Sequence, residues 1–404
     1  MRHFLNRVYF DWAASAPYID DKLSSGNNIF FGNPSSKHSE GKEAKAAIEK
    51  AREQCAAALN VSPQTLYFTS GGTESNSIAL FSNLTRKGQG RILASMAEHA
   101  SIREGMETLA GMGKSIGKIA VDSTGRVTAD TLEKALEKYP DTRFISIMSV
   151  NNETGSVTDI PSLVNVIRKK TDGSAPIHFH CDLVQAVGKI PVDIQGWEID
   201  SVSISAHKIC GPRGIGLLYL RRPLEVFYSG GGQEKGIRGG TENTMGAIAL
   251  AKCLETMNNE QLIIDNEKAF SRMNKLITAL SKMERCELIP ANRSMLDSPI
   301  SSNCSPQTVN CSLLTVHCFS PYILQAAFRD IPGEVMARAL DDKGFAVSTG
   351  SACSSSSNER PVLAAMGVNE KLRIEGIRIS QGYTTTDEEI DLLIEAIEEV
   401  LKFL

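Results

Sequence analysis

The stretch Ser201-Val202-Ser203-Ile204-Ser205-Ala206-His207-Lys208 alternates serines with small or apolar residues, which is the pattern of a buried strand. The pattern ends at His207-Lys208, and a segment containing glycine and proline follows over residues 209–216. Lys208 therefore stands at a strand end. A pocket there would lower the pKa of the lysine amine, which could then form a Schiff base with a carbonyl compound. An ordinary surface lysine is the alternative, and the rest of the chain decides between the two.

Length and composition indicate an ordinary globular protein with room for two domains. The chain has 404 residues, of which 42% are hydrophobic and 22% charged. A net charge of −4 predicts no binding to nucleic acid or to an anionic membrane, and no apolar run approaches the ~20 residues of a spanning helix. Residues 1–7 lack a signal-peptide core, so we expect a cytoplasmic location. The nine cysteines are typical of thiols in a reducing compartment, not of a disulfide framework.

Strand and helix patterns alternate along most of the chain. We predict strands over 65–69, 91–95, 143–150 and 177–182, and helices over 39–59, 73–84 and 161–170. This alternation predicts an α/β fold with a largely parallel sheet and helices on both of its faces. A helical pattern over 246–280 carries the chain from one domain to the next. We place a large cofactor-binding domain at 15–258 and a small α+β domain at 1–14 with 259–404.

Polar residues follow the strand ends, where ligands bind in sheets of this kind. Ser70-Gly71-Gly72-Thr73 joins a strand to a helix start, which presents backbone N–H groups and a positive dipole end to an anion. It lacks the spacing of a Walker loop. Further polar residues at strand ends are His99, Asn152, Asp182, Gln185, His207 and Lys208. Each has a structural alternative, such as a helix cap, a turn residue or a partly buried histidine, but their coincidence in one sheet favours a site.

Two loops and a late strand add further candidates. The glycine-rich segment 228–241 is either ligand-facing or interface-forming, with a flexible surface loop as the alternative. Cys353 lies in the Gly/Ser-rich segment 349–358, where an exposed loop suits a nucleophile that must travel, although it could be one more thiol. Arg378 falls on a strand over 377–380, and arginine binds carboxylates bidentately.

The polar segment 291–320 holds four residues that could be metal ligands. They are Cys304, Cys311, His317 and Cys318. Their spacing contains no CxxC pair and matches no common zinc pattern, so we expect thiols there and no metal site.

Together these residues suit pyridoxal phosphate acting on an amino acid. Lys208 would carry the cofactor, the helix start at Gly72 would bind its phosphate, and Asp182 would keep the pyridine nitrogen protonated. Arg378 would bind the carboxylate of the amino acid.

The chain also resembles the cysteine desulfurases of the class V aminotransferase group, from about residue 8 to residue 400. The matching stretches, in family order, are 31–36, 69–75, 98–99, 150–153, 180–182 with Gln185, 205–208 with 211–212, 230–234 with Arg238 and Thr241, and 350–353 with Arg378. The resemblance implies the fold type I of pyridoxal-phosphate-dependent transferases, with a large domain and a smaller C-terminal α+β domain.

The resemblance also implies a role for each matching residue. Lys208 would hold the cofactor and later move protons, Asp182 would pair with the ring nitrogen, and Gln185 would pair with the ring hydroxyl. His99 would stack on the ring and belong to the catalytic residues. The phosphate would be held by Gly72, Thr73, Ser205 and His207.

On the substrate side, Asn152 and Arg378 would bind the carboxylate of L-cysteine. Cys353 would attack the substrate sulfur, which leaves L-alanine and a persulfide for an acceptor protein. That acceptor would serve iron–sulfur cluster or thio-cofactor synthesis. Thr241 would reach the phosphate in a neighbouring subunit, which implies a homodimer.

Three departures from the family pattern stand out. Gln233 occupies a position where many relatives have histidine, so an acid role there is in doubt, and Cys210 replaces a common tyrosine. The segment 291–320 looks longer than in relatives. The alternatives to a cysteine desulfurase are a selenocysteine lyase, a class V aminotransferase for another amino acid, and a degenerate, non-enzymatic assembly subunit.

Overall fold

The computed structural model describes residues 7–18, 31–86, 90–171, 175–257, 260–291, 293, 318–350 and 360–404. Cys353 lies outside these ranges, as do Cys304, Cys311 and His317, so what the sequence predicts for them stays a prediction. Within the described ranges, no helix has both the length and the apolar character needed to span a membrane.

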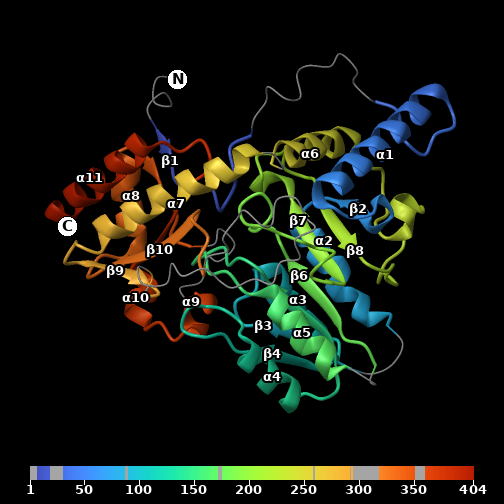
Figure 1. Cartoon of the computed structure of the whole chain (residues 1–404), viewed down its shortest axis with the longest axis horizontal. Coiled ribbons are helices and arrows are strands. Elements are labelled where there is room, and N and C mark those ends of the chain that lie inside the picture. Colours follow the sequence, from blue (N-terminus) through green and yellow to red (C-terminus); the bar gives the residue numbers. More distant parts are fainter. Residues whose placement is uncertain are drawn as a thin grey trace.

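A seven-stranded sheet forms the larger part of the molecule (Figure 1). Its strands, in spatial order, are β2 (Leu66–Thr69), β8 (Gly216–Leu220), β7 (Ser201–Ser205), β6 (His178–Asp182), β5 (Thr142–Met148), β3 (Arg91–Ser95) and β4 (Ile116–Ile119). Only β8 runs antiparallel to its neighbours in this sheet, and the other neighbouring pairs are parallel. The sheet is therefore mostly parallel, as predicted.

Helices cover both faces of this sheet because its strands alternate their apolar side chains between two cores. On β5, Ile145 and Ile147 pack in the core beneath α1 (Ser39–Leu59), α4 (Ala129–Lys138), α5 (Ile160–Lys170) and α6 (Thr244–Thr256). Phe144 points to the opposite face and packs with α2 (Gly72–Phe81) and α3 (Ala100–Gly111). Because both faces of the sheet are buried, its strands are nearly continuous runs of apolar residues.

A second core lies at the other end of the molecule, formed by the C-terminal elements (Figure 1). Its three-stranded antiparallel sheet has the order β12 (Gly376–Ser380), β10 (Ile323–Phe328) and β9 (Cys286–Ile289). The helices of this part are α7 (Glu260–Leu280), α8 (Gly333–Asp342), α9 (Pro361–Ala365), α10 (Glu370–Glu375) and α11 (Asp387–Phe403). Near the N-terminus, β1 (Val8–Tyr9) pairs with β11 (Phe345–Ala346), and Phe10 joins the second core. The domain boundaries given above stay predictions.

The predicted elements differ from the observed ones mainly at their ends. The helical pattern over 246–280 is two helices, α6 and α7, and the strand predicted over 143–150 ends at Met148. Helix α2 stops at Phe81 and continues as the 3-10 turn η3 (Ser82–Leu84). Several helix starts are set by local capping, as at Thr128 and Thr386, which both form capping boxes.

Candidate active site

A cavity of about 290 Å³ lies at the carboxyl ends of the parallel strands. Predicted site residues line it: Gly72, Thr73, His99, Asn152, Asp182, Gln185, Ser205, His207, Lys208 and Arg378. Ala13, Ala14, Asn76, Met148 and Val184 complete the wall. The structure therefore brings together residues that are spread over more than 300 positions of the chain. Thr241 is exposed and does not line this cavity, and Cys353 lies outside the described residues.

One end of the cavity presents an anion-binding helix terminus. Helix α2 begins at Gly72, and its N-cap Gly71 makes no side-chain capping bond, so the first backbone N–H groups are open to a ligand. A Cβ atom at Gly72 would lie 2.7 Å from Cγ2 of Val184, so only glycine lets the helix start come this close to its neighbour. Ser205 and His207 add a hydroxyl and an imidazole to the cavity wall.

Lys208 closes the 3-10 turn η4 (Ala206–Lys208), which directly follows β7. Its Nζ donates to the backbone carbonyls of Ala13 at 2.6 Å and Ala14 at 2.8 Å. The amine is thereby held inside the cavity and is not an ordinary surface lysine. Burial, together with the nearby cations Lys208 and Arg213, lowers the pKa of His207 to about 4, so its ring is neutral at pH 7.

Asp182 ends strand β6, and both of its carboxylate oxygens accept hydrogen bonds. Oδ1 accepts from the backbone N–H of Val184 at 2.9 Å, and Oδ2 accepts from Nδ2 of Asn76 at 2.8 Å. Three residues on, Gln185 donates from Nε2 to the Ala13 carbonyl at 2.8 Å and accepts from Nζ of Lys189 at 2.6 Å. Burial and the neighbouring Lys208 lower the pKa of Lys189 to about 7.

His99 is the N-cap of helix α3 and lines the cavity at the end of the turn after β3. Its Nδ1 accepts from the backbone N–H of Ser101 at 3.1 Å, and burial lowers the pKa of its ring. The preceding residue, Glu98, accepts a hydrogen bond from the backbone N–H of Met148 at 2.6 Å. Burial, and then the nearby charge of Asp182, raises the pKa of Glu98 to about 8.

Arg378 reaches the cavity from β12, a strand of the second core. Its side chain is 1% exposed, Nη1 donates to the Asn152 backbone carbonyl at 2.9 Å, and Nη2 donates to Oδ1 of Asp11 at 2.6 Å. Nε is buried without a hydrogen-bond partner among the described residues. The two residues predicted to bind the substrate carboxylate are thus in direct contact, Asn152 through its backbone.

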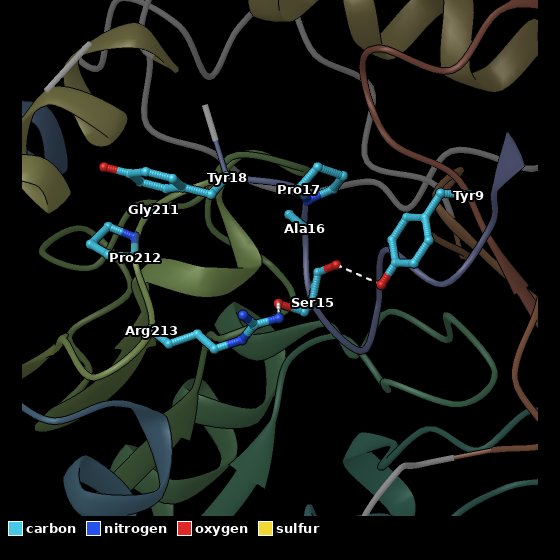
Figure 2. A pocket seen from close by; sticks show the side chains of 8 residues that line it. All are labelled: Tyr9, Ser15, Ala16, Pro17, Tyr18, Gly211, Pro212 and Arg213. Atoms are coloured by element: carbon cyan, nitrogen blue, oxygen red, sulfur yellow. Dashed lines mark hydrogen bonds between the residues drawn. The ribbon is translucent and has the colours of Figure 1, made fainter. Parts of the chain in front are cut away.

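Figure 2 shows a second hollow, of about 460 Å³. It is lined by Tyr9, Ser15, Ala16, Pro17, Tyr18, Gly211, Pro212 and Arg213. Ser15 belongs to its wall and also lies 3.3 Å, Oγ to Nδ1, from His207 of the first cavity. Residues 13–16 therefore run from the wall of the first cavity, at Ala13 and Ala14, to the wall of the second hollow, at Ser15 and Ala16.

The glycine-rich segment 228–241 is fixed to helix α1 and to strand β2 through one buried carboxylate, that of Glu234. Both carboxylate oxygens of Glu234 lie 2.7 Å from the guanidinium nitrogens of Arg52, and the side chains are 1% and 3% exposed. Oε2 of Glu234 also accepts from the backbone N–H of Phe68 at 2.7 Å. The segment is therefore anchored at its centre.

Several residues of this site were not singled out from the sequence. Asn76 follows the predicted helix start by one turn, and that spacing could have placed its side chain beside Thr73. Asp11 and the carbonyls of Ala13 and Ala14 come from the N-terminal segment, for which the sequence carries no pattern that predicts contact with Lys208 or Arg378.

Comparison with known proteins agrees with this geometry. The family model of the class-V aminotransferases matches residues 8–393. A cysteine desulfurase IscS of Dictyoglomus turgidum is 36% identical over 98% of this chain and 95% of its own length, and one of Vibrio cholerae is 35% identical over 96% and 91%.

Two solved structures of NifS-like proteins are also similar to this chain. A NifS-like protein superposes with a TM-score of 0.84 at 32% identity, covering 99% of this chain and all of the other. The NifS-like protein of Rickettsia africae superposes with a TM-score of 0.79 at 27% identity, covering 98% of this chain and all of the other. With its mostly parallel sheet and its cavity at the strand ends, the chain belongs to the class-V aminotransferase family, and within it the chain is similar to the cysteine desulfurases.

Proposed function

We propose that this protein is a pyridoxal-phosphate-dependent cysteine desulfurase that converts L-cysteine to L-alanine and passes the sulfur to an acceptor protein. The observation that carries the proposal is the cavity itself, which unites the Lys208 amine, the Asp182 carboxylate, the open start of α2 and the Arg378 guanidinium. The similarity to cysteine desulfurases over nearly the whole chain supports the choice of substrate.

The residues of the cavity fit pyridoxal phosphate. The helix start at Gly72 and Thr73, with Ser205 and His207, would hold the phosphate, and Lys208 would hold the cofactor covalently through its amine. Asp182 would pair with the ring nitrogen, Gln185 with the ring hydroxyl, and His99 would lie against the ring. When bound, the cofactor supplies an electron sink for the negative charge that develops at the substrate Cα.

The protein's own groups then bind and move protons. Arg378 and Asn152 orient the substrate carboxylate, and the Arg378 guanidinium supplies charge-assisted hydrogen bonds from a buried position. Lys208, held at the strand end, is the base and acid for the proton at Cα. Cys353, as a thiolate, attacks the substrate sulfur, so that an S–S bond forms while the C–S bond breaks and leaves its electron pair on the alanine carbon.

We further propose a homodimer in which Thr241 of each chain reaches the phosphate site of the other. Thr241 is exposed in the single chain, and the Arg52–Glu234 pair anchors its segment to helix α1. The sulfur acceptor would be a scaffold or a sulfur carrier protein, and the protein would act in the cytoplasm.

The proposal is tested by incubating the purified protein with L-cysteine and measuring alanine and sulfide. We expect both products from the wild type and neither from Cys353→Ser, because a hydroxyl cannot accept the sulfur. Cys286→Ser is the matched control, since Cys286 lies on β9 and does not line the cavity. A wild type that makes no alanine from cysteine would exclude a desulfurase. Full sulfide release by Cys353→Ser would exclude Cys353 as the nucleophile. Product formation from L-selenocysteine alone would favour the lyase alternative.

A further inference from the structure

Asn76, on helix α2, lies between two side chains of the central strands and uses every polar atom that it has. Asn76 is 1% exposed. Nδ2 donates to Oδ2 of Asp182 at 2.8 Å and to Oγ of Ser101 at 2.9 Å. Oδ1 lies 2.9 Å from Nε2 of His180. A buried amide with both of its ends engaged is the branching point of a hydrogen-bond network.

The direction of this network follows from its end point. A carboxylate only accepts hydrogen bonds, so the Asn76 amide must present its NH₂ group to Asp182 and its oxygen to His180. His180 must then donate, which requires a proton on its Nε2. Burial and the neighbouring His178 lower the pKa of His180 to about 3, so the ring is neutral and carries this one proton. Its Nδ1 is therefore an acceptor.

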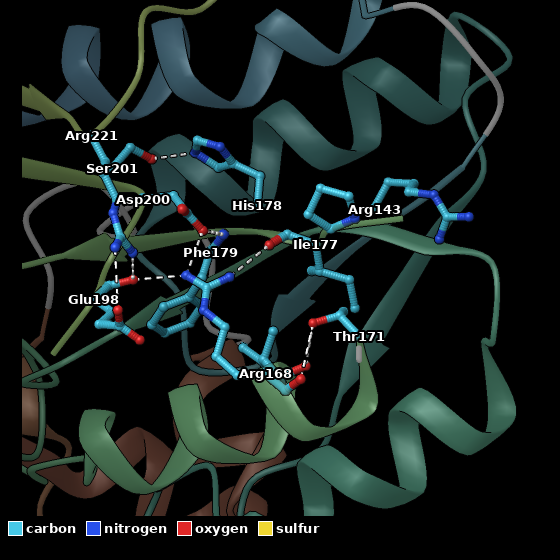
Figure 3. Close-up of polar contacts among 12 residues, drawn as sticks. Arg143, Arg168, Thr171, Ile177, His178, Phe179, Glu198, Asp200, Ser201 and Arg221 are labelled. Carbon is cyan, nitrogen blue, oxygen red and sulfur yellow. Dashed lines mark hydrogen bonds and ion pairs between the residues drawn. The ribbon is translucent and has the colours of Figure 1, made fainter. Parts of the chain in front are cut away.

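The acceptor Nδ1 of His180 lies 2.8 Å from Oγ of Ser201, whose proton must point toward it. Ser201 can then only accept from Nε2 of His178, which lies 2.7 Å away (Figure 3). The ring of Phe144 stacks on His178, with centroids 5.3 Å apart and an interplanar angle of 4°. Burial and the cations Arg86 and Arg168 lower the pKa of His178 to about 3, so this ring is neutral too. Along the path from His178 through Ser201, His180 and Asn76, each hydrogen bond is therefore donated in the direction of Asp182.

The second branch of the network leads to His99. Ser101 accepts from Asn76, so its own hydroxyl proton is available for Nδ1 of His99 at 2.9 Å. The backbone N–H of Ser101 donates to the same Nδ1 at 3.1 Å. Nδ1 thus accepts twice, and the proton of the neutral His99 ring lies on Nε2. Asn76 is the point at which the branches to Asp182 and His99 meet.

We propose that Asn76 is a positioning residue that sets the Asp182 carboxylate and aligns the Ser101 hydroxyl with His99. Through one N–H it holds the Asp182 carboxylate as an acceptor, and through the other it turns the Ser101 hydroxyl proton toward Nδ1 of His99, which already accepts from the Ser101 backbone N–H. His180, Ser201 and His178 keep the amide in the orientation that this requires. The inference rests on the proposed function, because it assigns these two groups to pyridoxal phosphate.

The test uses Asn76→Leu, which keeps the size of the side chain and removes all three hydrogen bonds. Two quantities are measured: the affinity of the full-length protein for pyridoxal phosphate, and the tautomers of its histidines by NMR after selective ¹⁵N-histidine labelling. We expect the affinity to fall on the order of 10-fold to 100-fold, because a hydrogen bond to a buried charge is lost. We also expect His180 to lose its uniform Nε2–H signature, whereas His99, whose Nδ1 still accepts from the Ser101 backbone N–H, keeps it.

Three further variants separate the branches, and a fourth controls for stability. Ser101→Ala removes the hydroxyl link to His99 but keeps the backbone N–H toward its Nδ1, so it should leave the tautomers of His99 and His180 and most of the cofactor affinity intact. His180→Leu should weaken cofactor binding as Asn76→Leu does, whereas His180→Gln, which keeps a donor toward Oδ1 of Asn76, should restore most of it. Asn83→Leu is the matched control, since Asn83 is another buried amide and donates, among the residues that the structure describes, to the local Leu80 carbonyl.

Wild-type affinity in Asn76→Leu, or an Nδ1–H tautomer of His180 in the wild type, would overturn the inference. Equal losses of cofactor affinity in Asn76→Leu and Asn83→Leu would also overturn the inference, because the loss would then reflect general destabilisation of the protein. A wild type that takes up no pyridoxal phosphate would refute the proposed function instead, and the histidine tautomers of the same sample would still decide whether Asn76 orders the network.

Discussion

Nη2 of Arg378 lies 2.6 Å from Oδ1 of Asp11, so an ion pair at the cavity joins two residues that are 367 positions apart. The guanidinium is 1% exposed and Asp11 is 22% exposed by their side chains. This pair fixes the plane of the guanidinium before any substrate arrives. The Asn152 carbonyl adds a second contact to the same group, at Nη1.

Replacing Arg378 by lysine should therefore damage substrate binding although the charge is kept. A lysine ammonium cannot contact Asp11, the Asn152 carbonyl and a substrate carboxylate in one plane. We expect the KM for L-cysteine to rise roughly 10-fold to 100-fold, as for the loss of a charge-assisted hydrogen bond. Steady-state kinetics checks this, with Arg221→Lys as the control, because Arg221 forms a surface pair with Glu198. An unchanged KM would move the carboxylate site elsewhere.

The homodimer can be tested by complementation between two inactive variants. Lys208→Ala removes the amine that would hold the cofactor, and Thr241→Glu places a negative charge where Thr241 would meet the partner's phosphate. Each variant alone should be inactive. Co-expressed with different tags and purified as a mixed dimer, they should regain activity, because one of the two sites then has both Lys208 and Thr241 intact. A mixed dimer as inactive as its parents would contradict action of Thr241 across the interface.

Glu98 should make stability depend on pH. Burial raises its pKa from an ordinary value near 4.5 to about 8, so between these values the folded protein binds a proton that the unfolded chain releases. The free energy of unfolding should therefore fall as the pH rises through this window. Glu98→Gln, which can keep the bond from the Met148 N–H, removes this dependence.

The measurement is urea unfolding of the wild type and Glu98→Gln at pH 6 and pH 8. We expect the wild type to lose on the order of 2 kcal/mol more than the variant between these values. Glu284→Gln, at an exposed carboxyl, should behave as the wild type does. Parallel pH profiles of the wild type and Glu98→Gln would show that Glu98 is ionised in the folded protein.

The Arg52–Glu234 pair should show the cost of an unpaired buried charge. Arg52→Met leaves the Glu234 carboxylate buried and, among the described residues, held by the Phe68 N–H alone. We therefore expect the free energy of unfolding to fall by about 3–5 kcal/mol. Adding Glu234→Leu should recover part of this loss. Lys134→Met, which breaks an exposed pair with Asp130, should leave the melting temperature unchanged. If the double variant loses as much free energy of unfolding as the two single variants together, Arg52 and Glu234 are not coupled.

Much of the site could be predicted from strand ends. The apolar runs ending at Thr69, Met148 and Asp182 are local patterns, and parallel strands bring their carboxyl ends to one edge of a sheet. Residues soon after those runs, such as Thr73, Asn152 and Gln185, are therefore predicted to lie at the site and do line the cavity, as do His99 after β3 and Lys208 after β7. The role of Asn76 was not predicted, because its partners Asp182, Ser101 and His180 are brought to it only by the packing of α2 against β6 and α3.

By itself, the sequence determined the α/β alternation, the helix start at Gly72, the lysine at the end of β7 and the resemblance to the cysteine desulfurases. These features are encoded in short segments, where hydrophobic period and turn residues act locally. Only the tertiary structure decided that Asp11 pairs with Arg378, that Ala13 and Ala14 hold the Lys208 amine, and that Asn76 links Asp182 to His99. The reason is physical: a buried polar group must find a partner wherever packing places one, and no local pattern states which distant residue that will be.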